Sequence, residues 1–327
     1  MKKKSALIFG ISGQDGTYLA SLLLKKGYLV YGVSRDAGVN NFSSLKQHDL
    51  FQEVSLYSGT LTDFRSTLQI LKRLQPDEIY NFSGQSSVGL SFDMPVETLE
   101  SIATGTLNIL EALRFLDYPA RFYNAGSSEC FGDCAGLAAN EETAFRPKSP
   151  YGVAKAAAHW EVANYRDSYS LFSCTGILFN HESPIRPERF VTRKISSAAA
   201  RISNGSEEKV FLGDLGVERD WGWAPEYVQA MWSMLQLPSP EDFVISTGEP
   251  ISLRRFVEAC FDFFNLDWKE HVVQDPSLFR PAEIEISYGD PDKAKKMLGW
   301  NATTKASQVA MSMAKSDSLL LGIKRKE

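Results

Sequence analysis

The stretch ALIFGISGQDGTYLA occupies residues 6–20 and joins an apolar run to a helix-forming segment. Its three glycines, in G-x-x-G-x-x-G spacing, are Gly10, Gly13 and Gly16. The apolar run predicts a buried strand, and the segment at 18–25 predicts a helix. Glycines allow a tight turn and close approach of a pyrophosphate, and a helix N-terminus offers unpaired N–H groups to an anion. The stretch therefore predicts a dinucleotide-binding turn, although glycine turns also end strands without binding a ligand.

Four further apolar runs follow this turn and alternate with helix-length amphipathic stretches. The rhythm indicates strand–helix–strand units, and continuous apolar runs are typical of parallel strands buried on both faces. We therefore predict an α/β protein with a doubly wound parallel sheet and functional groups at the carboxyl ends of its strands. The runs are YLVYGVS at 28–34, EIYNFS at 78–83, RFYNAGSS at 121–128 and FSCTGILFN at 172–180.

The rhythm loosens in the second half of the chain into shorter strands and helices, which we interpret as a smaller substrate-binding lobe of mixed α/β structure. We place a dinucleotide-binding domain at 1–180 and this lobe at 181–327, with some of its segments returning to the parallel sheet. The segments that indicate the lobe are KVFLG at 209–213, EYVQAMWSML at 226–235, DFVIST at 242–247 and FVEACFDFF at 256–264.

Composition and charge are those of an ordinary globular protein. Of the 327 residues 43% are hydrophobic, and 35 Lys and Arg stand against 40 Asp and Glu, a net charge of −5. We therefore expect no nucleic-acid partner. No apolar run is long enough to span a bilayer, and the N-terminal MKKKSALIFG lacks a cleavage site, so we expect a cytoplasmic protein with no membrane partner. The four cysteines match no zinc spacing, so we expect no metal.

The end of the second strand bears on the choice of dinucleotide. An acidic residue there would bind the ribose 2′-hydroxyl of NAD, but the strand ends at Ser34. Arg35 can pair with a 2′-phosphate and favours NADP, whereas Asp36 leaves NAD open. The alternative is an arginine–aspartate pair on a solvated turn, without a ligand.

The segment SPYGVAK at 149–155 predicts the start of a helix, with Ser149 as N-cap and Pro150 at the first helical position. Tyr151 and Lys155 are then on one helix face, where the ammonium would lower the pKa of the phenol from about 10. Such a tyrosine can take a proton from a hydroxyl while hydride leaves for a nicotinamide. Most Tyr-x-x-x-Lys pairs are only exposed helix faces, but the upstream glycine motif favours catalysis.

Ser127, Ser128 and Glu129 close the run RFYNAGSS, at the end of a strand that should face the same crevice. Strand alternation predicts Ser127 and Glu129 on one side and Ser128 on the other. Oxidation of an alcohol needs no carboxylate, whereas elimination needs a base for the proton next to a new ketone. Glu129 can be that base, and a helix-capping or surface glutamate is the alternative.

Together these motifs resemble the extended short-chain dehydrogenase/reductase family, which has a Rossmann cofactor domain. The resemblance sharpens to the GDP-mannose 4,6-dehydratases over nearly the whole chain, and FNHESP followed by FVTRKI is more specific than the glycine turn. It implies a GDP-sugar substrate, a 4-keto-6-deoxy product, a catalytic NADP or NAD, and a homodimer or homotetramer. The motifs are GISGQDGTYLA at 10–20, YNFSGQSSV at 80–88, SPYGVAK at 149–155, GILFNHESP at 176–184, FVTRKI at 190–195, RDWG at 219–222 and FRPAEIE at 279–285.

The resemblance also implies roles for individual residues. Tyr151 would oxidise C4 with help from Lys155 and from the hydroxyl of Ser127. Glu129 would remove the C5 proton. Positions that match the cofactor site are Gly10, Gly13, Gln14, Asp15, Gly16, Arg35, Thr60, Leu61, Phe82, Ser83, Gln85, Ser86, Tyr151, Lys155, His181 and Arg186. Positions that match the substrate site are Ser87, Ser128, Glu129, Asn180, Val191, Lys194, Leu212, Arg219, Arg280 and Glu283.

Several positions depart from the family pattern, including Ser127 in place of the common threonine and Cys130 and Phe131 beside Glu129. Asp36 stands where a second arginine is usual, Thr60 where an aspartate is usual, and Ser87 where a histidine lies near the sugar. A GDP-heptose 4,6-dehydratase, or another nucleotide-sugar dehydratase or epimerase, therefore stays open. So does a nucleotide-binding protein without turnover, because a fold alone does not define a function.

Overall fold

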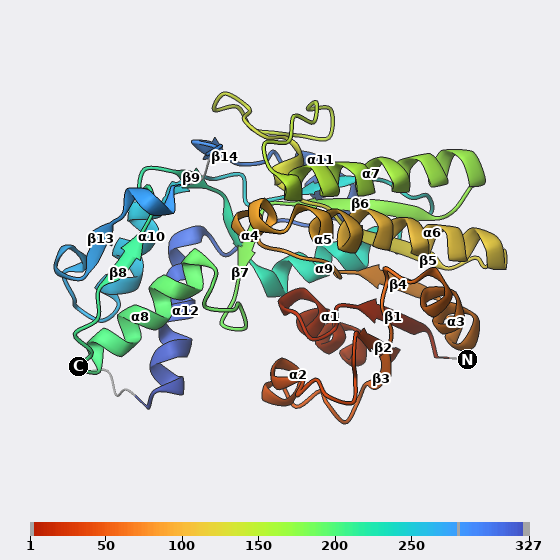
Figure 1. The fold of residues 1–327 in the computed structure, drawn as a ribbon, viewed down its shortest axis with the longest axis horizontal. Helices are drawn as coiled ribbons and strands as arrows, with labels where there is room; N and C mark the ends of the chain where they lie inside the picture. Colours follow the sequence, from red (N-terminus) through yellow and green to blue (C-terminus); the bar gives the residue numbers. More distant parts are fainter. Residues whose placement is uncertain (1–2, 280–281, 323–327) are drawn as a thin grey trace.

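A seven-stranded parallel sheet forms the centre of the molecule in the computed structural model, which describes residues 3–279 and 282–322. The strand order is β11-β6-β5-β4-β1-β2-β3 and every pairing is parallel, which confirms the predicted doubly wound sheet (Figure 1). The strands are β1 (Ser5–Phe9), β2 (Leu29–Ser34), β3 (Ser55–Ser58), β4 (Glu78–Asn81), β5 (Arg121–Ala125), β6 (Ser173–Leu178) and β11 (Phe243–Ile245).

Helices cover both faces of this sheet, which explains the continuous apolar runs. In β1, Ala6 and Ile8 belong to one buried core, and Leu7 and Phe9 belong to the core on the opposite face. Because successive side chains of a strand point to opposite faces, a strand between two helix layers must be apolar at every position. The first core includes residues of α1 (Gln14–Lys25) and α9 (Ala224–Met234), and the second includes residues of α3 (Phe64–Leu74), α6 (Gly105–Leu116) and α7 (Pro150–Tyr169).

Two helix starts position the functional groups. The predicted start at Pro150 is confirmed, because Ser149 Oγ accepts a hydrogen bond from the N–H of Gly152 at 3.0 Å. The first helix begins earlier than predicted, at Gln14. Gly13 is its N-cap, so the helix follows the glycine turn without an intervening loop.

Two strands differ from the sequence expectation. The strand expected at 121–128 ends at Ala125, and a 3₁₀ turn at Ser128–Cys130 follows it. The polar strand β3 was not among the expected strands, because it is a short edge strand whose residues are only partly buried. Apolar patterning marks central strands more clearly than edge strands.

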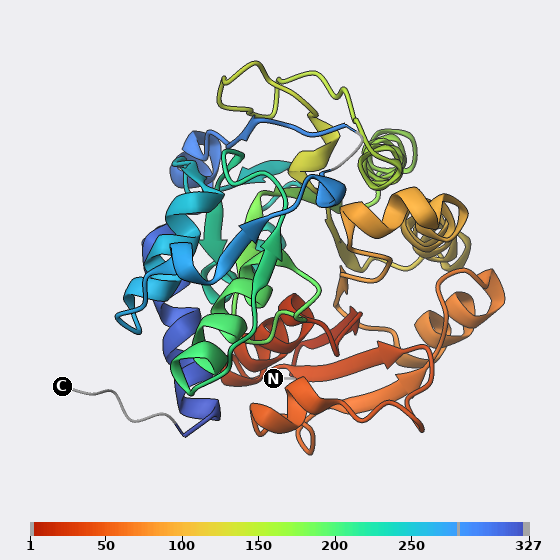
Figure 2. The ribbon, with the colours of Figure 1, turned by 60° about the vertical axis from the view of Figure 1, so that its left-hand side comes forward.

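Most of the chain after β6 forms a second lobe beside the sheet, while α9 and β11 return to the sheet (Figures 1 and 2). The lobe has its own buried core, which includes Phe256, Phe261 and Met313. Its elements are β7 (Asn180–Glu182), α8 (Val191–Ser203), β8 (Val210–Leu212), β9 (Glu218–Arg219), β10 (Trp221–Trp223), β12 (Ile251–Ser252), α10 (Leu253–Asp262), β13 (Val272–Gln274), β14 (Ile286–Ser287) and α12 (Ala306–Leu320). The other helices are α2 (Ser43–Gln47), α4 (Val88–Asp93), α5 (Pro95–Leu99), a π-helix at Glu100–Thr104, α11 (Asp292–Leu298) and two 3₁₀ turns at Trp268–Glu270 and Pro276–Leu278. Within the described ranges, every helix is too short or too polar to cross a lipid bilayer.

Candidate active site

A cleft of about 530 Å³ lies between the carboxyl ends of the central strands and the second lobe. The loop after β5, the start of α7, the segment from β7 to α8, and β8 contribute most of its walls. Predicted site residues from both halves of the chain line it: Asp15, Phe82, Ser86, Ser87, Ser127, Ser128, Glu129, Tyr151, Lys155, Asn180, His181, Arg186, Val191, Lys194, Leu212, Arg219 and Glu283.

The other predicted cofactor residues lie at the ends of neighbouring strands rather than in the wall of the cleft. Arg35 is exposed directly after β2, and Thr60 and Leu61 follow β3. Ser83 and Gln85 follow β4. These positions follow strands β2, β3 and β4, at the edge of the sheet where a dinucleotide would extend. Gly10, Gly13, Gln14 and Gly16 form the turn after β1 and the start of α1, and Arg280 lies outside the described residues.

Residues outside the predicted site set also line the cleft, among them Arg189, Phe190 and Asp214. The guanidinium of Arg189 lies 5.0 Å from the ring centre of Phe190. Arg189 directly precedes the FVTRKI motif and Phe190 is its first residue, so this motif is the sequence signal that could have identified them. Residue type alone does not separate a binding arginine in a loop from a solvated one.

The glycine turn has the geometry that a dinucleotide needs. Gly10 has a φ of +82°, and a Cβ there would lie 2.9 Å from the carbonyl carbon of Phe82. A Cβ on Gly16 would lie 2.4 Å from the carbonyl oxygen of Gly10. Gly13 is the N-cap of α1, and no side-chain capping hydrogen bond is made there. The turn can therefore present backbone N–H groups to a phosphate.

Tyr151 and Lys155 lie together in the cleft. Lys155 Nζ is 5.8 Å from the ring centre of Tyr151 and donates to the carbonyl oxygen of Ala125 at 2.7 Å. Burial lowers the pKa of Lys155 to about 8. Burial also raises the pKa of Tyr151, and a hydrogen bond with Ser127 opposes this only in part. The predicted lowering of the phenol pKa is therefore wrong, because burial outweighs the nearby charges.

Glu129 reaches the same cleft from a 3₁₀ turn. Ser127 Oγ caps this turn by accepting a hydrogen bond from the N–H of Glu129 at 3.3 Å. Ser127, Ser128 and Glu129 all line the cleft, so the predicted alternation across a strand is wrong. The cleft thus brings a carboxylate, a phenol, an ammonium and a hydroxyl together, which is enough for two separate proton transfers.

The opposite end of the cleft belongs to the second lobe and carries groups suited to a nucleotide diphosphate. Arg219 Nη2 donates to Glu283 Oε1 at 2.8 Å. Lys194 Nζ donates to the carbonyl oxygen of Phe211 at 2.7 Å. Guanidinium and ammonium groups bind phosphate oxygens, and a carboxylate accepts hydrogen bonds from ribose hydroxyls. Proton-transfer groups therefore occupy one end of the cleft and anion-binding groups the other.

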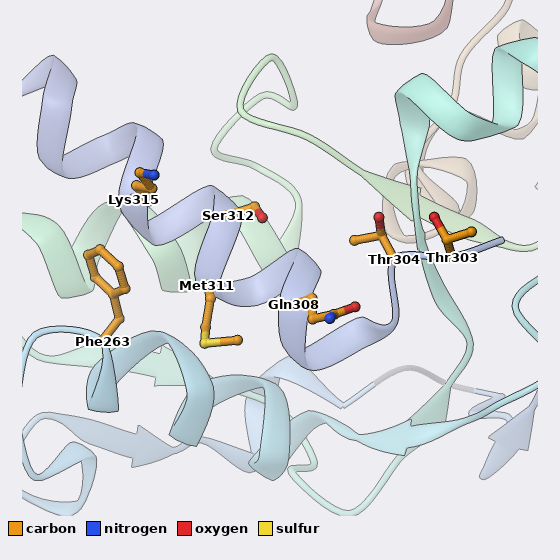
Figure 3. Close-up of a pocket in the computed structure, with 7 residues that line it drawn as sticks. All are labelled: Phe263, Thr303, Thr304, Gln308, Met311, Ser312 and Lys315. Carbon is orange, nitrogen blue, oxygen red and sulfur yellow. The ribbon is translucent and has the colours of Figure 1, made fainter.

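A second hollow lies between the end of α10 and α12 (Figure 3). The hydroxyls of Thr303 and Thr304 donate to the carboxylate of Glu226. Gln308 Oε1 accepts a hydrogen bond from the N–H of Lys305 at 3.0 Å. These polar groups hold the start of α12 in place, so we assign no catalytic role to this hollow.

Comparison with known proteins decides the family. A family model described as GDP-mannose 4,6 dehydratase matches residues 7–313. The chain belongs to the GDP-mannose 4,6-dehydratase family. Curated members of this family include GDP-mannose 4,6 dehydratase 1 of Arabidopsis thaliana, which is 42% identical over 96% of this chain and 90% of its own length. The GDP-mannose 4,6-dehydratase of Sinorhizobium fredii is 43% identical over 96% of this chain and 97% of its own length. The predicted family resemblance is confirmed.

Solved structures confirm the fold of this GDP-mannose 4,6-dehydratase family member. A UDP-glucose 4-epimerase from Thermotoga maritima, solved with UDP-glucose, has a TM-score of 0.85 at 19% identity and covers 98% of this chain and 100% of its own. RMD from Pseudomonas aeruginosa, solved with NADPH, has a TM-score of 0.80 at 22% identity and covers 97% and 100%. At these identities the likeness shows the fold alone.

Proposed function

We propose that this chain is a GDP-mannose 4,6-dehydratase, a lyase that converts GDP-mannose to GDP-4-keto-6-deoxymannose. The observation that carries the proposal is the position of Glu129 in the same cleft as Tyr151 and Lys155. A tyrosine and a lysine suffice for oxidation of an alcohol, but loss of water also needs a base for the C5 proton. Relatives at 42% and 43% identity carry this name over nearly the whole chain.

We infer that the cofactor is NADP, held by the glycine turn and by the strand ends beside it. A nicotinamide held there would supply reversible hydride transfer between C4 and C6, with no net change of the cofactor. Asp36 Oδ1 already accepts hydrogen bonds from the N–H groups of Gly38 at 2.9 Å and Val39 at 3.2 Å. Its carboxylate is therefore engaged within the turn. Arg35 is then the side chain that would contact the adenosine ribose, and a guanidinium favours the 2′-phosphate of NADP over the 2′-hydroxyl of NAD.

The side chains around the cleft divide the proton transfers between them. Tyr151 accepts the proton of the C4 hydroxyl in its ionised form, which the hydrogen bond with Ser127 favours against burial. Lys155 Nζ, 5.8 Å from the ring centre, is the nearby ammonium that would assist once substrate and cofactor are bound. Glu129 accepts the C5 proton, which then leaves with the C6 hydroxyl as water. The proton held by Tyr151 restores C5 after hydride reaches C6. The balance is the loss of one water with no net oxidation or reduction.

The experiment that tests this proposal incubates the purified protein with GDP-mannose and NADP⁺ and follows the nucleotide sugar by mass spectrometry. Loss of one water without net NADPH formation is the expected result. An unchanged mass would contradict the proposal for mannose. Binding of cofactor and GDP-sugars without conversion of any of them would identify a nucleotide-binding protein instead.

A GDP-heptose 4,6-dehydratase is the second candidate, and Ser87 favours it. Ser87 lines the cleft where the family resemblance places a histidine near the sugar. Its side chain also caps α4 by accepting a hydrogen bond from the N–H of Leu90 at 3.3 Å. Serine is smaller than histidine and leaves space for a longer sugar. Dehydration of a GDP-heptose but not of GDP-mannose would establish this alternative.

Arg35→Ala is expected to weaken NADP binding about tenfold or more and to change NAD binding little. The guanidinium can form a charge-assisted pair with the 2′-phosphate, which NAD lacks. Isothermal titration calorimetry with both dinucleotides gives the comparison. Ser58→Ala, which removes a hydroxyl that holds the N–H of Ala37 at 3.0 Å, controls for disturbance of the turn. Equal losses for NADP and NAD in Arg35→Ala would refute the 2′-phosphate assignment.

We propose that the protein is a homodimer formed through an apolar face of α5 and α7. Val153 and Trp160 lie two turns apart on α7 and are 49% and 61% exposed, and Val96 of α5 is 68% exposed. The two helices pack side by side (Figure 1), and each has exposed apolar side chains of the kind that mark protein interfaces. Trp160→Glu should shift the protein toward a monomer in analytical ultracentrifugation. Leu137→Glu, on an exposed loop, should not, and a monomeric wild type would contradict the proposal.

A further inference from the structure

His181 and Asp15 form an ion pair that joins the second lobe to the start of the cofactor helix. His181 Nε2 lies 3.0 Å from each carboxylate oxygen of Asp15, and Nδ1 lies 2.8 Å from the carbonyl oxygen of Phe179. Both partners can only accept hydrogen bonds. A neutral imidazole has a single N–H and would leave one ring nitrogen facing an acceptor without a proton. The geometry is satisfied in full only by the imidazolium.

The surroundings of the pair contain charges of both signs. Burial by itself lowers the pKa of His181, but the charge and hydrogen bond of Asp15 outweigh burial and raise it. Burial raises the pKa of Asp15, but His181, Arg186 and Gln14 together outweigh burial and the pKa is lowered. The titratable and charged groups around the pair are Tyr18 of α1, Tyr123 of β5, Lys155 of α7, Glu182 and Arg186 in and after β7, Asp220 before β10, and Tyr227 of α9, whose ring stacks on the imidazole at 4.6 Å.

Two further hydrogen bonds join the same segments. Gln14 Nε2 donates to the carbonyl oxygen of His181 at 3.0 Å, and Ser183 Oγ donates to Gln14 Oε1 at 2.7 Å. Both bonds are buried. The segment that begins the second lobe is therefore fixed to the first turn of α1. A change at His181 would alter the contacts of the glycine turn.

Asp15 places a carboxylate where a bound phosphate would also lie. It stands in the first turn of α1, where the backbone N–H groups and the helix dipole attract phosphate. A carboxylate there is stabilised by the helix but repels a bound diphosphate. The imidazolium of His181 opposes this charge at 3.0 Å. The pair thus brings the turn close to neutrality without removing the carboxylate.

We propose that protonated His181 is a positioning residue for the dinucleotide. It neutralises Asp15 at the phosphate-binding turn, so that the turn can bind the diphosphate. The inference rests on the proposed NADP-dependent function and adds a pH-dependent link between the second lobe and the cofactor turn. When His181 loses its proton, Asp15 keeps its charge without a counter-charge. NADPH affinity is therefore expected to fall about tenfold as pH rises through the titration of His181.

The test measures the Kd of NADPH by fluorescence between about pH 6 and about pH 9, the range in which a perturbed histidine titrates. The wild type should bind tightly at the acidic end and more weakly at the alkaline end. Asp15→Asn should flatten this dependence, because no carboxylate is left to repel the diphosphate. Lys155 also titrates near the alkaline end, since burial lowers its pKa to about 8, but it is present in both proteins. Because the charge of Asp15 also raises the pKa of Lys155, an NMR readout is needed to assign the difference between the two profiles to His181.

A matched control and a second readout make the result decisive. His159→Gln replaces another buried histidine, outside the cleft, and should keep the wild-type profile. Histidine-selective ¹⁵N NMR, with the His181 signal assigned by its loss in His181→Gln, should show an imidazolium at neutral pH. A neutral His181, or a wild-type profile in Asp15→Asn, would overturn this inference alone. Failure of NADPH to bind at any pH would overturn the proposed function together with the inference.

Discussion

The Glu129→Gln variant is expected to lose dehydration while it still oxidises its substrate at C4. Glutamine keeps the shape of the side chain but cannot accept the C5 proton, and such proton transfer contributes about 10²- to 10⁴-fold to a rate. Tyr151 and Lys155 stay in place, so hydride transfer from C4 continues and reduced cofactor accumulates on the enzyme. Mixing the variant with GDP-mannose should raise the near-ultraviolet absorbance of reduced nicotinamide, and mass spectrometry should detect no loss of water.

Glu161→Gln is the matched control for this variant. Glu161 lies on α7, outside the cleft, and burial raises the pKa of its carboxyl to about 7. A neutral glutamine therefore replaces a carboxyl that is already partly protonated near neutral pH, and turnover should be unchanged. Dehydration by Glu129→Gln at the wild-type rate would show that another group removes the C5 proton, and the assignment of Glu129 would then be wrong.

The sequence was most informative where local chemistry decides local structure. Ser149 and Pro150 predict a helix start from capping rules alone, and the structure has that start. The buried strands before Gly10 and in β6 follow from apolar runs in the same way. The alignment of Tyr151 with Lys155 then needs only the helix period. These features depend on residues that are neighbours along the chain.

The features that the sequence does not predict depend on distant parts of the chain or on burial. Asp15 and His181 are 166 positions apart, so nothing in either motif indicates their pairing. The phenol of Tyr151 has a raised pKa because other segments cover it, and the surrounding segments are not evident from SPYGVAK. The strand that leads to Glu129 ends early because Ser127 caps a 3₁₀ turn, a choice that strand patterning does not encode. Site residues can thus be named from motifs, but their protonation and orientation need the folded chain.

The Tyr151→Phe variant is expected to stop the reaction one step earlier than Glu129→Gln. Without the phenol, no group accepts the proton of the C4 hydroxyl, and the rate should fall about 10³-fold or more. Burial raises the pKa of Tyr151, and Ser127 and Arg186 lower it only in part, so this proton acceptor depends on a specific set of neighbours. The phenyl ring preserves most of the packing, and NADPH should bind within a few-fold of its wild-type Kd. Rapid mixing with GDP-mannose should therefore produce no reduced cofactor at all.

Tyr123→Phe is the control that separates catalysis from packing. Tyr123 is fully buried in β5 outside the cleft, and within the described part of the chain its hydroxyl has no hydrogen-bond partner. Removal of that hydroxyl should leave activity intact and should not lower stability, because no buried partner loses a hydrogen bond. Appearance of reduced cofactor in Tyr151→Phe, as in Glu129→Gln, would show that Tyr151 does not take the C4 hydroxyl proton. If instead Glu129→Gln forms reduced cofactor and Tyr151→Phe does not, the two residues act in successive steps, with oxidation at C4 preceding removal of the C5 proton.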